Sequence, residues 1–163
     1  MKKLVVFYSF EGNTRYIAQS IAKAIDADLL ELKPKEAVKS KGIMKYFWGG
    51  KQVVLGQKPE IQLIDKDPNE YDFIIFGTPV WAFSYAPAFN TFFSTIKITG
   101  KRVALFCCNG GSKGKTFANM RNELKENTIL GEIEFMDPIK GDEKKAEEAA
   151  KWAGKIFSDI EEG

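Results

Sequence analysis

Near its N-terminus the chain reads Leu4-Val5-Val6-Phe7-Tyr8-Ser9-Phe10-Glu11-Gly12-Asn13-Thr14-Arg15, an apolar run that switches within a few residues to a small, polar turn containing glycine. This switch predicts a buried strand, a turn and the start of a helix. The turn offers hydroxyls at Ser9 and Thr14, a flexible backbone at Gly12 and free N–H groups at the helix start, all of which can bind an anion. The stretch therefore predicts a phosphate-binding turn between a strand and a helix.

The spacing within this turn differs from that of both familiar nucleotide-binding loops. No Gly-x-Gly-x-x-Gly motif follows the first strand, and Gly-x-x-x-x-Gly-Lys-Ser/Thr does not occur in the chain. A phosphate ester smaller than a dinucleotide or a nucleoside triphosphate is therefore the better guess for the ligand. Taken by itself, the turn from Ser9 to Thr14 is equally compatible with a capped helix start that binds nothing.

Length and composition predict one domain over residues 1–163. A chain of 163 residues, 44% of them hydrophobic, is long enough for one well-buried core and too short for two comfortable domains. Lys2 and Lys3 precede an apolar run that is too short for a signal peptide, and no later run approaches the length of a membrane span. We therefore expect a cytoplasmic protein with no membrane insertion and no nucleic-acid partner.

Charged and sulfur-containing residues narrow the chemistry further. The formal charge is +2 and the chain has no histidine, which argues against imidazole catalysis and against a metal site. Cys107 and Cys108 are adjacent at the end of an apolar run, a pattern that favours reduced thiols; a vicinal redox pair is the alternative. The stretch from Lys33 to Lys58 contains seven lysines and one acidic residue, Glu36. This block either guides a negatively charged partner or is an ordinary solvated face.

Apolar runs alternate with helical patterns along the whole chain. Strands are predicted near residues 4–7 and over residues 28–32, 71–77, 101–107 and 128–136, and helices over residues 14–25, part of 39–55, 87–96, 116–125 and 142–160. Asn13 is expected to cap the first helix. This alternation predicts an α/β fold, a three-layer sandwich in which helices cover both faces of a five-stranded parallel sheet. The expected strand order is 2-1-3-4-5.

Unusual loops follow the first, third and fourth predicted strands. The first is the phosphate-type turn, the second runs from Gly77 to Pro87 and is rich in aromatic residues, and the third runs from Asn109 to Gly114 and is rich in glycine. In open parallel sheets, ligands bind beyond the carboxyl ends of the strands, where the strand order reverses. The loops therefore predict an anion site, an aromatic wall and a wall of backbone groups, which together fit a planar ring on a phosphate tail.

With these features the chain resembles the short-chain flavodoxins over nearly its whole length. The family's phosphate loop reads Ser/Thr-x-Ser/Thr-Gly-x-Thr, and the stretch here is Ser9-Phe10-Glu11-Gly12-Asn13-Thr14. Glu11 stands where the family has a hydroxyl. Because a carboxylate beside a phosphate is repulsive, we expect its side chain to turn to solvent and its backbone N–H to serve the ligand. The resemblance implies a flavodoxin-like fold and FMN as the cofactor.

The resemblance also implies which residues contact FMN. Trp81 is the first choice for stacking on the flavin, and the glycines of the third loop let backbone N–H groups approach the ring's polar edge. No residue is expected to be catalytic or to bind a metal. The expected cofactor-binding residues are Ser9, Phe10, Glu11, Gly12, Asn13, Thr14, Thr78, Pro79, Val80, Trp81, Ala82, Phe83, Ser84, Tyr85, Asn109, Gly110, Gly111, Ser112 and Gly114.

Other aromatic residues have a plainer interpretation. Phe89, Phe92 and Phe93 recur at helical spacing and are interpreted as core residues. Trp48 stays undecided between the core and a cover for the cofactor.

Other protein classes with the same architecture are excluded by their own motifs. A response-regulator receiver needs acidic residues after the first strand and an Asp after the third, where this chain has Ser9 and Gly77-Thr78. A low-molecular-weight phosphatase needs a nucleophilic Cys in the first loop, which holds none. Three functions stay open: an FMN-binding electron carrier, an FMN-dependent NAD(P)H reductase of quinones or nitroaromatics, and an FMN-free regulatory or structural relative.

Two departures from typical flavodoxins bear on this choice. The chain carries a charge of +2, whereas flavodoxins are usually strongly acidic, and Pro79 to Tyr85 contains no glycine, whereas the family often has one beside the flavin. One-electron and two-electron chemistry therefore both stay open, and with them whether the protein is an oxidoreductase enzyme. The expected partner is a redox protein for an electron carrier, or a nicotinamide cofactor for a reductase.

Overall fold

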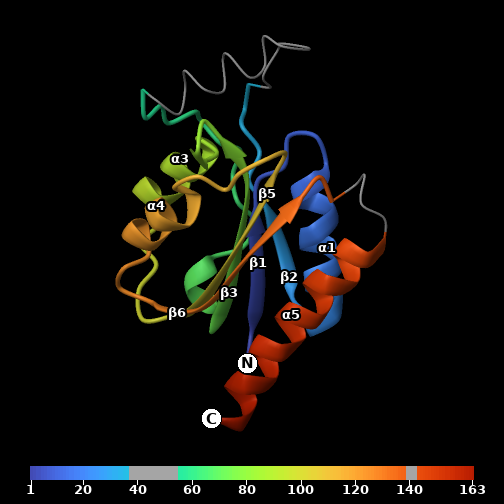
Figure 1. Ribbon diagram of the computed structural model, residues 1–163. Coiled ribbons are helices and arrows are strands. Elements are labelled where there is room, and N and C mark those ends of the chain that lie inside the picture. The colour runs from blue at the N-terminus through green and yellow to red at the C-terminus, as the bar shows by residue number, and fades with distance from the viewer. Residues whose placement is uncertain (37–54, 139–142) are drawn as a thin grey trace.

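Figure 1 shows a computed structural model of the chain, which describes residues 1–36, 55–138 and 143–163. A twisted sheet forms the centre, with helices on both sides. The strands are β1 (Lys3–Phe7), β2 (Asp28–Glu31), β3 (Phe73–Trp81), β4 (Ser84–Tyr85), β5 (Arg102–Asn109) and β6 (Thr128–Met136). The α-helices are α1 (Asn13–Ile25), α3 (Ala88–Thr95), α4 (Thr116–Glu123) and α5 (Glu143–Glu162), and a 3-10 turn spans Pro68–Glu70.

The parallel strands follow the order β2-β1-β3-β5-β6. Numbered as parallel strands along the chain, this is the order 2-1-3-4-5, so the predicted α/β fold class is confirmed. The short strand β4 was not predicted; it pairs antiparallel with the end of β3. Because the chain leaves β1 for one neighbour and later returns to the other, the strand order reverses between β1 and β3.

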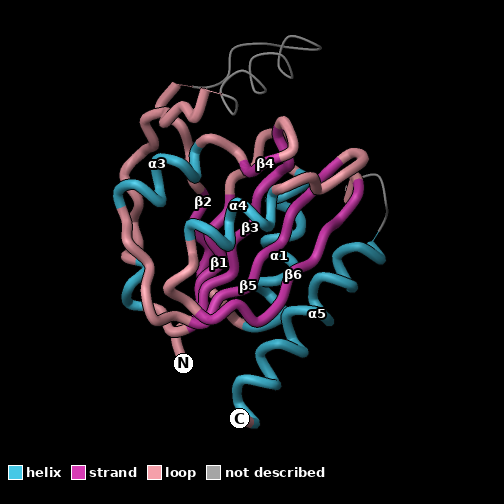
Figure 2. The backbone as a smooth tube through the Cα atoms, turned by 60° about the vertical axis from the view of Figure 1, so that its left-hand side comes forward, coloured by secondary structure: helices cyan, strands magenta, loops and turns pink. Residues whose placement is uncertain are grey.

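The helices form two layers, as Figures 1 and 2 show: α1 and α5 lie on one face of the sheet, and α3 and α4 on the other. Successive strand residues point to opposite faces, so the apolar strands feed two cores. On β1, Val5 packs with the α1 and α5 side, whereas Leu4 and Val6 pack with the α3 and α4 side. Burial on both faces explains why these strands read as continuous apolar runs rather than alternating ones.

The apolar side chains of α1 and α3 that face the sheet are buried. In α1 the buried side chains include Ile17, Ala18, Ile21, Ala22 and Ile25. In α3, Phe89 and Phe92 are fully buried and Phe93 packs against the same core, which confirms their interpretation as core residues.

The predicted cap of the first helix is wrong. The N-cap residue is Gly12, not Asn13, and as a glycine it has no side chain with which to cap the helix. Gly12 takes the left-handed conformation, with φ 99°, which glycine adopts at little cost. The helix therefore begins one residue early, and Asn13 is its first residue.

Strands β3 and β5 run further than the sequence indicated. Thr78 to Trp81, expected in a loop, continue β3. Thr78 and Pro79 pair with β5, and Val80 and Trp81 pair with β4 in a tight hairpin. β5 likewise includes Cys108 and Asn109. The predicted helical segment within 39–55 falls almost wholly outside the described residues, as does Trp48. No helix in the described part of the chain is long and apolar enough to span a bilayer.

Candidate functional site

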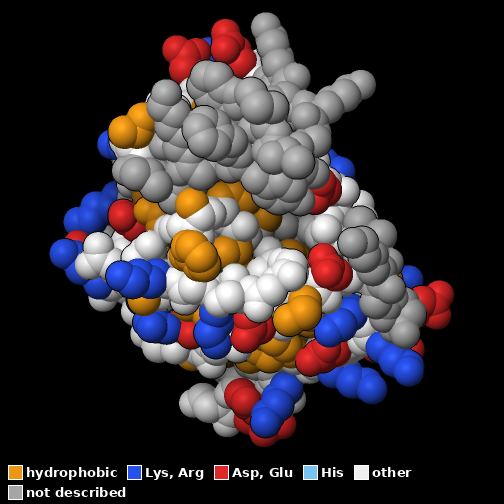
Figure 3. Space-filling view, turned by 45° about the horizontal axis from the view of Figure 1, so that its top comes forward, with side chains coloured by type: hydrophobic (Ala, Val, Ile, Leu, Met, Phe, Trp, Pro, Cys, Tyr) orange, Lys and Arg blue, Asp and Glu red, His pale blue; other side chains and the backbone are white. Residues whose placement is uncertain are grey.

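A cavity lies at the carboxyl ends of β1, β3 and β5, beside the point where the strand order reverses. Its volume is about 200 Å³, and it is partly open to solvent. In the space-filling view of Figure 3, apolar side chains gather at this end of the molecule. The lining residues are Ser9, Phe10, Glu11, Asn13, Thr14, Pro79, Val80, Trp81, Ala82, Cys108, Asn109, Gly110 and Asp137. All three loops singled out from the sequence therefore contribute to one cavity.

The turn between β1 and α1 forms the polar end of the cavity. The backbone N–H of Arg15 donates to Ser9 Oγ at 3.1 Å, which holds the Ser9 hydroxyl over the helix start. Thr14, only 1% exposed, lies in the first turn of α1. The N-terminus of a helix carries partial positive charge, so this end of the cavity suits an anion.

The hydrogen-bond donors described at the polar end of the cavity are uncharged groups. The guanidinium of Arg15 is paired with the carboxylate of Glu31 on β2, and among the described residues no Lys or Arg lines the cavity. Glu11 is exposed and contributes to the lining of the cavity; that its carboxylate turns away from a bound phosphate stays a prediction. Within the part of the chain that the structure describes, the groups available to a phosphate are therefore hydroxyls and N–H groups rather than cationic side chains.

Trp81, at the end of β3, forms the aromatic wall. Its ring meets the rings of Tyr8 and Phe10 edge to face, each with centroids 5.6 Å apart and planes at 85°. These contacts restrain the indole from the side of the β1 loop. The hairpin that follows turns through Ala82 and Phe83, which both adopt positive φ angles of 45° and 63°.

The third side of the cavity is a loop fixed by the Asn109 side chain. Asn109 Nδ2 donates to Glu134 Oε2 at 3.1 Å, and its Oδ1 accepts from the Gly111 N–H at 3.0 Å. The Asp137 N–H donates to the Asn109 carbonyl at 3.0 Å, which ties the ends of β5 and β6 together. Gly110, within this loop, contributes to the lining of the cavity.

Two lining residues, Cys108 and Asp137, were not predicted. Asp137 directly follows β6 and has a positive φ of 42°, a strained conformation for a residue other than glycine. Its place directly after the last predicted strand was the available signal. Cys108 is 4% exposed, and burial raises the pKa of its thiol to about 12. The sequence signal for Cys108 was strand alternation, which places the side chains of Cys107 and Cys108 on opposite faces of the sheet.

Several predicted contact residues lie beside the cavity rather than on its lining. They are Gly12, Thr78, Phe83, Ser84, Tyr85, Gly111, Ser112 and Gly114. The Thr78 hydroxyl is fully buried and accepts from the Ala86 N–H at 3.0 Å. Ser84 Oγ accepts from Asn119 Nδ2 at 2.8 Å, so it faces α4. A role for these residues toward the cofactor stays a prediction.

The other residues in this group support the walls. Phe83 is 69% exposed at the hairpin tip, and its backbone lies against Gly114. Tyr85 donates from its hydroxyl to Glu123 Oε1 on α4 at 3.3 Å. Within the described residues, no group of three or more Cys, Asp and Glu side chains is placed to hold a metal ion.

Comparison with known proteins points in the same direction as this geometry. The model of the family described as Flavodoxin matches residues 2–156. The chain is 23% identical to a flavodoxin from Haemophilus influenzae, in an alignment that covers 95% of this chain and 94% of that protein.

Solved structures show the same architecture. A flavoprotein from Lactobacillus acidophilus, determined in complex with FMN, is 26% identical and superposes with a TM-score of 0.71 over 91% of this chain and 98% of the other. A protein described as a flavoprotein from Bacteroides eggerthii, 21% identical, superposes with a TM-score of 0.77 over 96% of this chain and 98% of its own. The second likeness is one of fold.

Proposed function

The chain belongs to the flavodoxin family, and on that basis we propose that it binds FMN in the cavity and acts as an electron carrier. The observation that carries the proposal is the convergence of a helix N-terminus with two hydroxyls and a tryptophan wall on one cavity, beside the reversal of strand order. The FMN complex of the Lactobacillus acidophilus flavoprotein supports the choice of cofactor. FMN would supply the redox chemistry, and the protein its binding and orientation.

The residues present fit the parts of FMN in chemical type. The phosphate would lie at the turn from Ser9 to Thr14, where the donors are hydroxyls and N–H groups. The flavin ring would lie against Trp81, and its polar edge against the backbone at Asn109 and Gly110. The carboxylate of Asp137 is an acceptor for the hydroxyls of the chain that links ring and phosphate.

The buried cysteines take no part in this function as nucleophiles. Cys107 and Cys108 are both free and buried, and burial raises the pKa of each thiol to about 12. The chain has no histidine to act as a proton shuttle. The side chains of this protein would therefore bind the cofactor and shift its reduction potential, as an electron carrier requires. Two reduced thiols are also typical of a protein in the cytoplasm.

One experiment separates an electron carrier from an FMN-dependent NAD(P)H reductase. The FMN-loaded protein is photoreduced in one sample and mixed with NADPH or NADH in another, and both are followed by absorbance. A carrier takes up electrons in photoreduction and is reduced by the nicotinamide slowly, unless a reductase partner is added. Rapid oxidation of NAD(P)H in the presence of a quinone or nitroaromatic, with no second protein, would show that the protein is a reductase rather than an electron carrier.

A further inference from the structure

The β3–β4 hairpin carries Trp81 beyond the edge of the parallel pairing. Thr78 and Pro79 still pair with β5, but the last two residues of β3, Val80 and Trp81, pair with β4. β4 consists of only two residues, and one of them, Ser84, lies opposite Trp81. The place of Trp81 therefore depends on what holds β4.

The turn of this hairpin is unfavourable by itself. Its two residues, Ala82 and Phe83, have φ angles of 45° and 63°. Glycine or asparagine usually supplies such a turn, because positive φ is strained for residues with a larger side chain. Strained conformations persist only where the surrounding structure holds them. The hairpin therefore needs contacts from another element.

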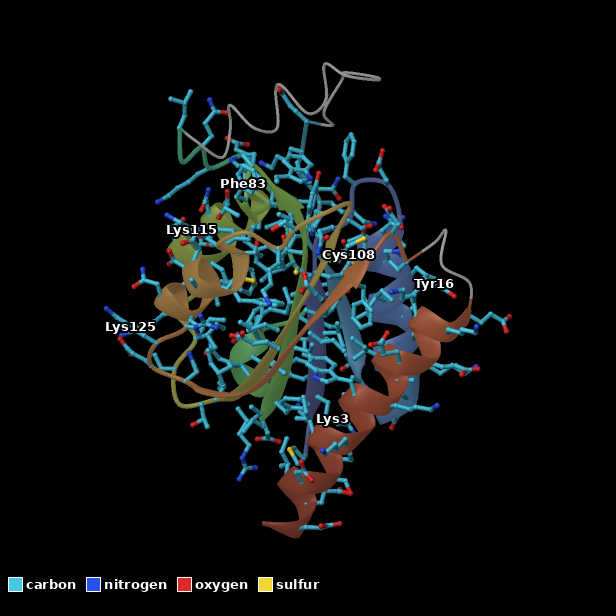
Figure 4. The ribbon with its side chains drawn as sticks, viewed as in Figure 1. Lys3, Tyr16, Phe83, Cys108, Lys115 and Lys125 are labelled. Carbon is cyan, nitrogen blue, oxygen red and sulfur yellow. The ribbon has the colours of Figure 1, made fainter. Side chains whose placement is uncertain are left out.

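Helix α4 supplies these contacts from one face. Three successive hairpin residues are hydrogen-bonded to residues four apart along the helix and its N-cap: Phe83 to Lys115 at 2.8 Å, Ser84 to Asn119 at 2.8 Å and Tyr85 to Glu123 at 3.3 Å. Residues four apart lie above one another on the same side of a helix. Figure 4 shows the first of these pairs, Phe83 and Lys115, side by side.

Asn119 makes the contact that bears most directly on Trp81. Its Nδ2 donates to the Oγ of Ser84, the residue paired with Trp81 across the hairpin. Side chains of two residues paired in this way lie on the same face, with Cβ atoms about 4.5–5.5 Å apart. The other two bonds start from a backbone group or involve the residue paired with Val80.

We propose that Asn119 is a positioning residue for the flavin ring: its side chain holds Ser84, and through Ser84 it fixes the Trp81 indole at the wall of the cavity. The inference rests on the proposed function, because the place of Trp81 matters to a ligand only if the flavin ring lies against it. It predicts that Asn119 affects FMN and riboflavin equally, since both carry the same ring.

The first test needs no ligand. The Trp81 band in the near-ultraviolet circular dichroism of the cofactor-free protein is identified by its loss in Trp81→Phe. Asn119→Ala is expected to weaken this band, because the indole is no longer held in one orientation. The far-ultraviolet spectrum should not change, since alanine favours a helix more than asparagine does. Asn122→Ala is the matched control, an exposed asparagine on the same helix, and should leave the band unchanged.

Two further variants show whether the hydrogen bond to Ser84 is responsible. Asn119→Asp keeps the shape of the side chain and can accept from the Ser84 hydroxyl, so the Trp81 band should return to its wild-type strength. In a Ser84→Ala background, which removes the partner, Asn119→Ala should have no further effect on the band.

The second test compares the affinities for FMN and riboflavin. Asn119→Ala is expected to weaken the binding of both by the same factor, about two- to tenfold, so that their ratio stays at the wild-type value. Asn122→Ala should change neither affinity.

The outcomes separate this inference from the proposed function. A wild-type protein that binds no FMN would overturn the proposed function, and with it the role of Asn119 toward the ligand. FMN binding in the wild type, combined with an unchanged Trp81 band in Asn119→Ala, would overturn the positioning role alone. Unequal or absent losses of affinity for FMN and riboflavin in that variant would do the same.

Discussion

Trp81 is the residue on which the aromatic wall of the cavity depends. Trp81→Ala is expected to weaken FMN binding by about 1–3 kcal/mol, by analogy with the stacking of bases on aromatic side chains. Fluorescence titration with FMN measures the loss. Trp152→Ala is the matched control, because Trp152 packs against the α1 and α5 side of the sheet and is not part of the cavity lining. Equal losses in the two variants would remove Trp81 from the ring site.

Asp137 places a carboxylate in the cavity, where the sequence did not predict one. A flavin gains negative charge on reduction, and a nearby carboxylate opposes that charge. Asp137→Asn is therefore expected to raise the midpoint potential of bound FMN while leaving the fold intact. The potential is measured by equilibration with a reference dye, and the remote Asp159→Asn, on the exposed part of α5, is the control. A potential that falls or does not change would show that the Asp137 carboxylate does not act on the flavin.

At the scale of the elements, the loop after β5 contacts the β3–β4 hairpin and holds it in place. The Lys115 N–H donates to the Phe83 carbonyl at 2.8 Å, and Gly114, with φ +52°, lies so close that an added Cβ would stand 2.6–2.8 Å from atoms of Phe83. The hairpin carries Trp81. Contact between these two loops therefore fixes the aromatic wall relative to the backbone wall.

Gly114→Ala tests this contact. The added methyl group meets both an unfavourable φ and the backbone of Phe83, so the free energy of unfolding is expected to fall by about 1–3 kcal/mol, with weaker FMN binding. Urea denaturation followed by circular dichroism gives the stability. Gly111→Ala is the control, since its added methyl group would meet no atom within 4 Å. If both variants were equally stable, the contact between the loops would not matter.

The elements also show how far the sequence determines the result. The strands of the sheet follow from continuous apolar runs, and the buried face of α1 follows from apolar residues at helical spacing; burial imposes both patterns directly. The hairpin was missed because Ala82 and Phe83 carry no turn signal, although both adopt the positive φ angles that asparagine and glycine usually supply. Asp137 and Cys108 were missed because their place in the cavity depends on how β5, β6 and α1 come together in space.

At the scale of the whole molecule, buried tyrosine and cysteine side chains make the free energy of unfolding depend on pH in the alkaline range. Burial, with a contribution from Glu31, raises the pKa of Tyr8 to about 12, and burial raises that of Cys107 and Cys108 to about 12. The folded protein thus holds these protons more tightly than the unfolded chain. The free energy of unfolding is expected to be insensitive to these groups at neutral pH and to fall as pH rises from about 9 to 12.

Tyr8→Phe isolates one contribution to this fall. Without the phenol hydroxyl, the loss of stability between pH 10 and pH 12 should be smaller than in the wild type, by up to about 2 kcal/mol. Urea denaturation at a series of pH values provides the comparison. Parallel pH profiles for the two proteins would show that the Tyr8 proton is held no more tightly in the folded state.

The sheet brings the β1–α1 turn, the β3–β4 hairpin and the β5–α4 loop to one cavity. Titration of FMN with the cofactor-free protein tests whether FMN binds there. We predict that FMN fluorescence is quenched, that the change saturates at one equivalent of protein, and that riboflavin binds more weakly because it lacks the phosphate. A titration in which folded protein leaves FMN fluorescence unchanged would contradict FMN binding in this cavity.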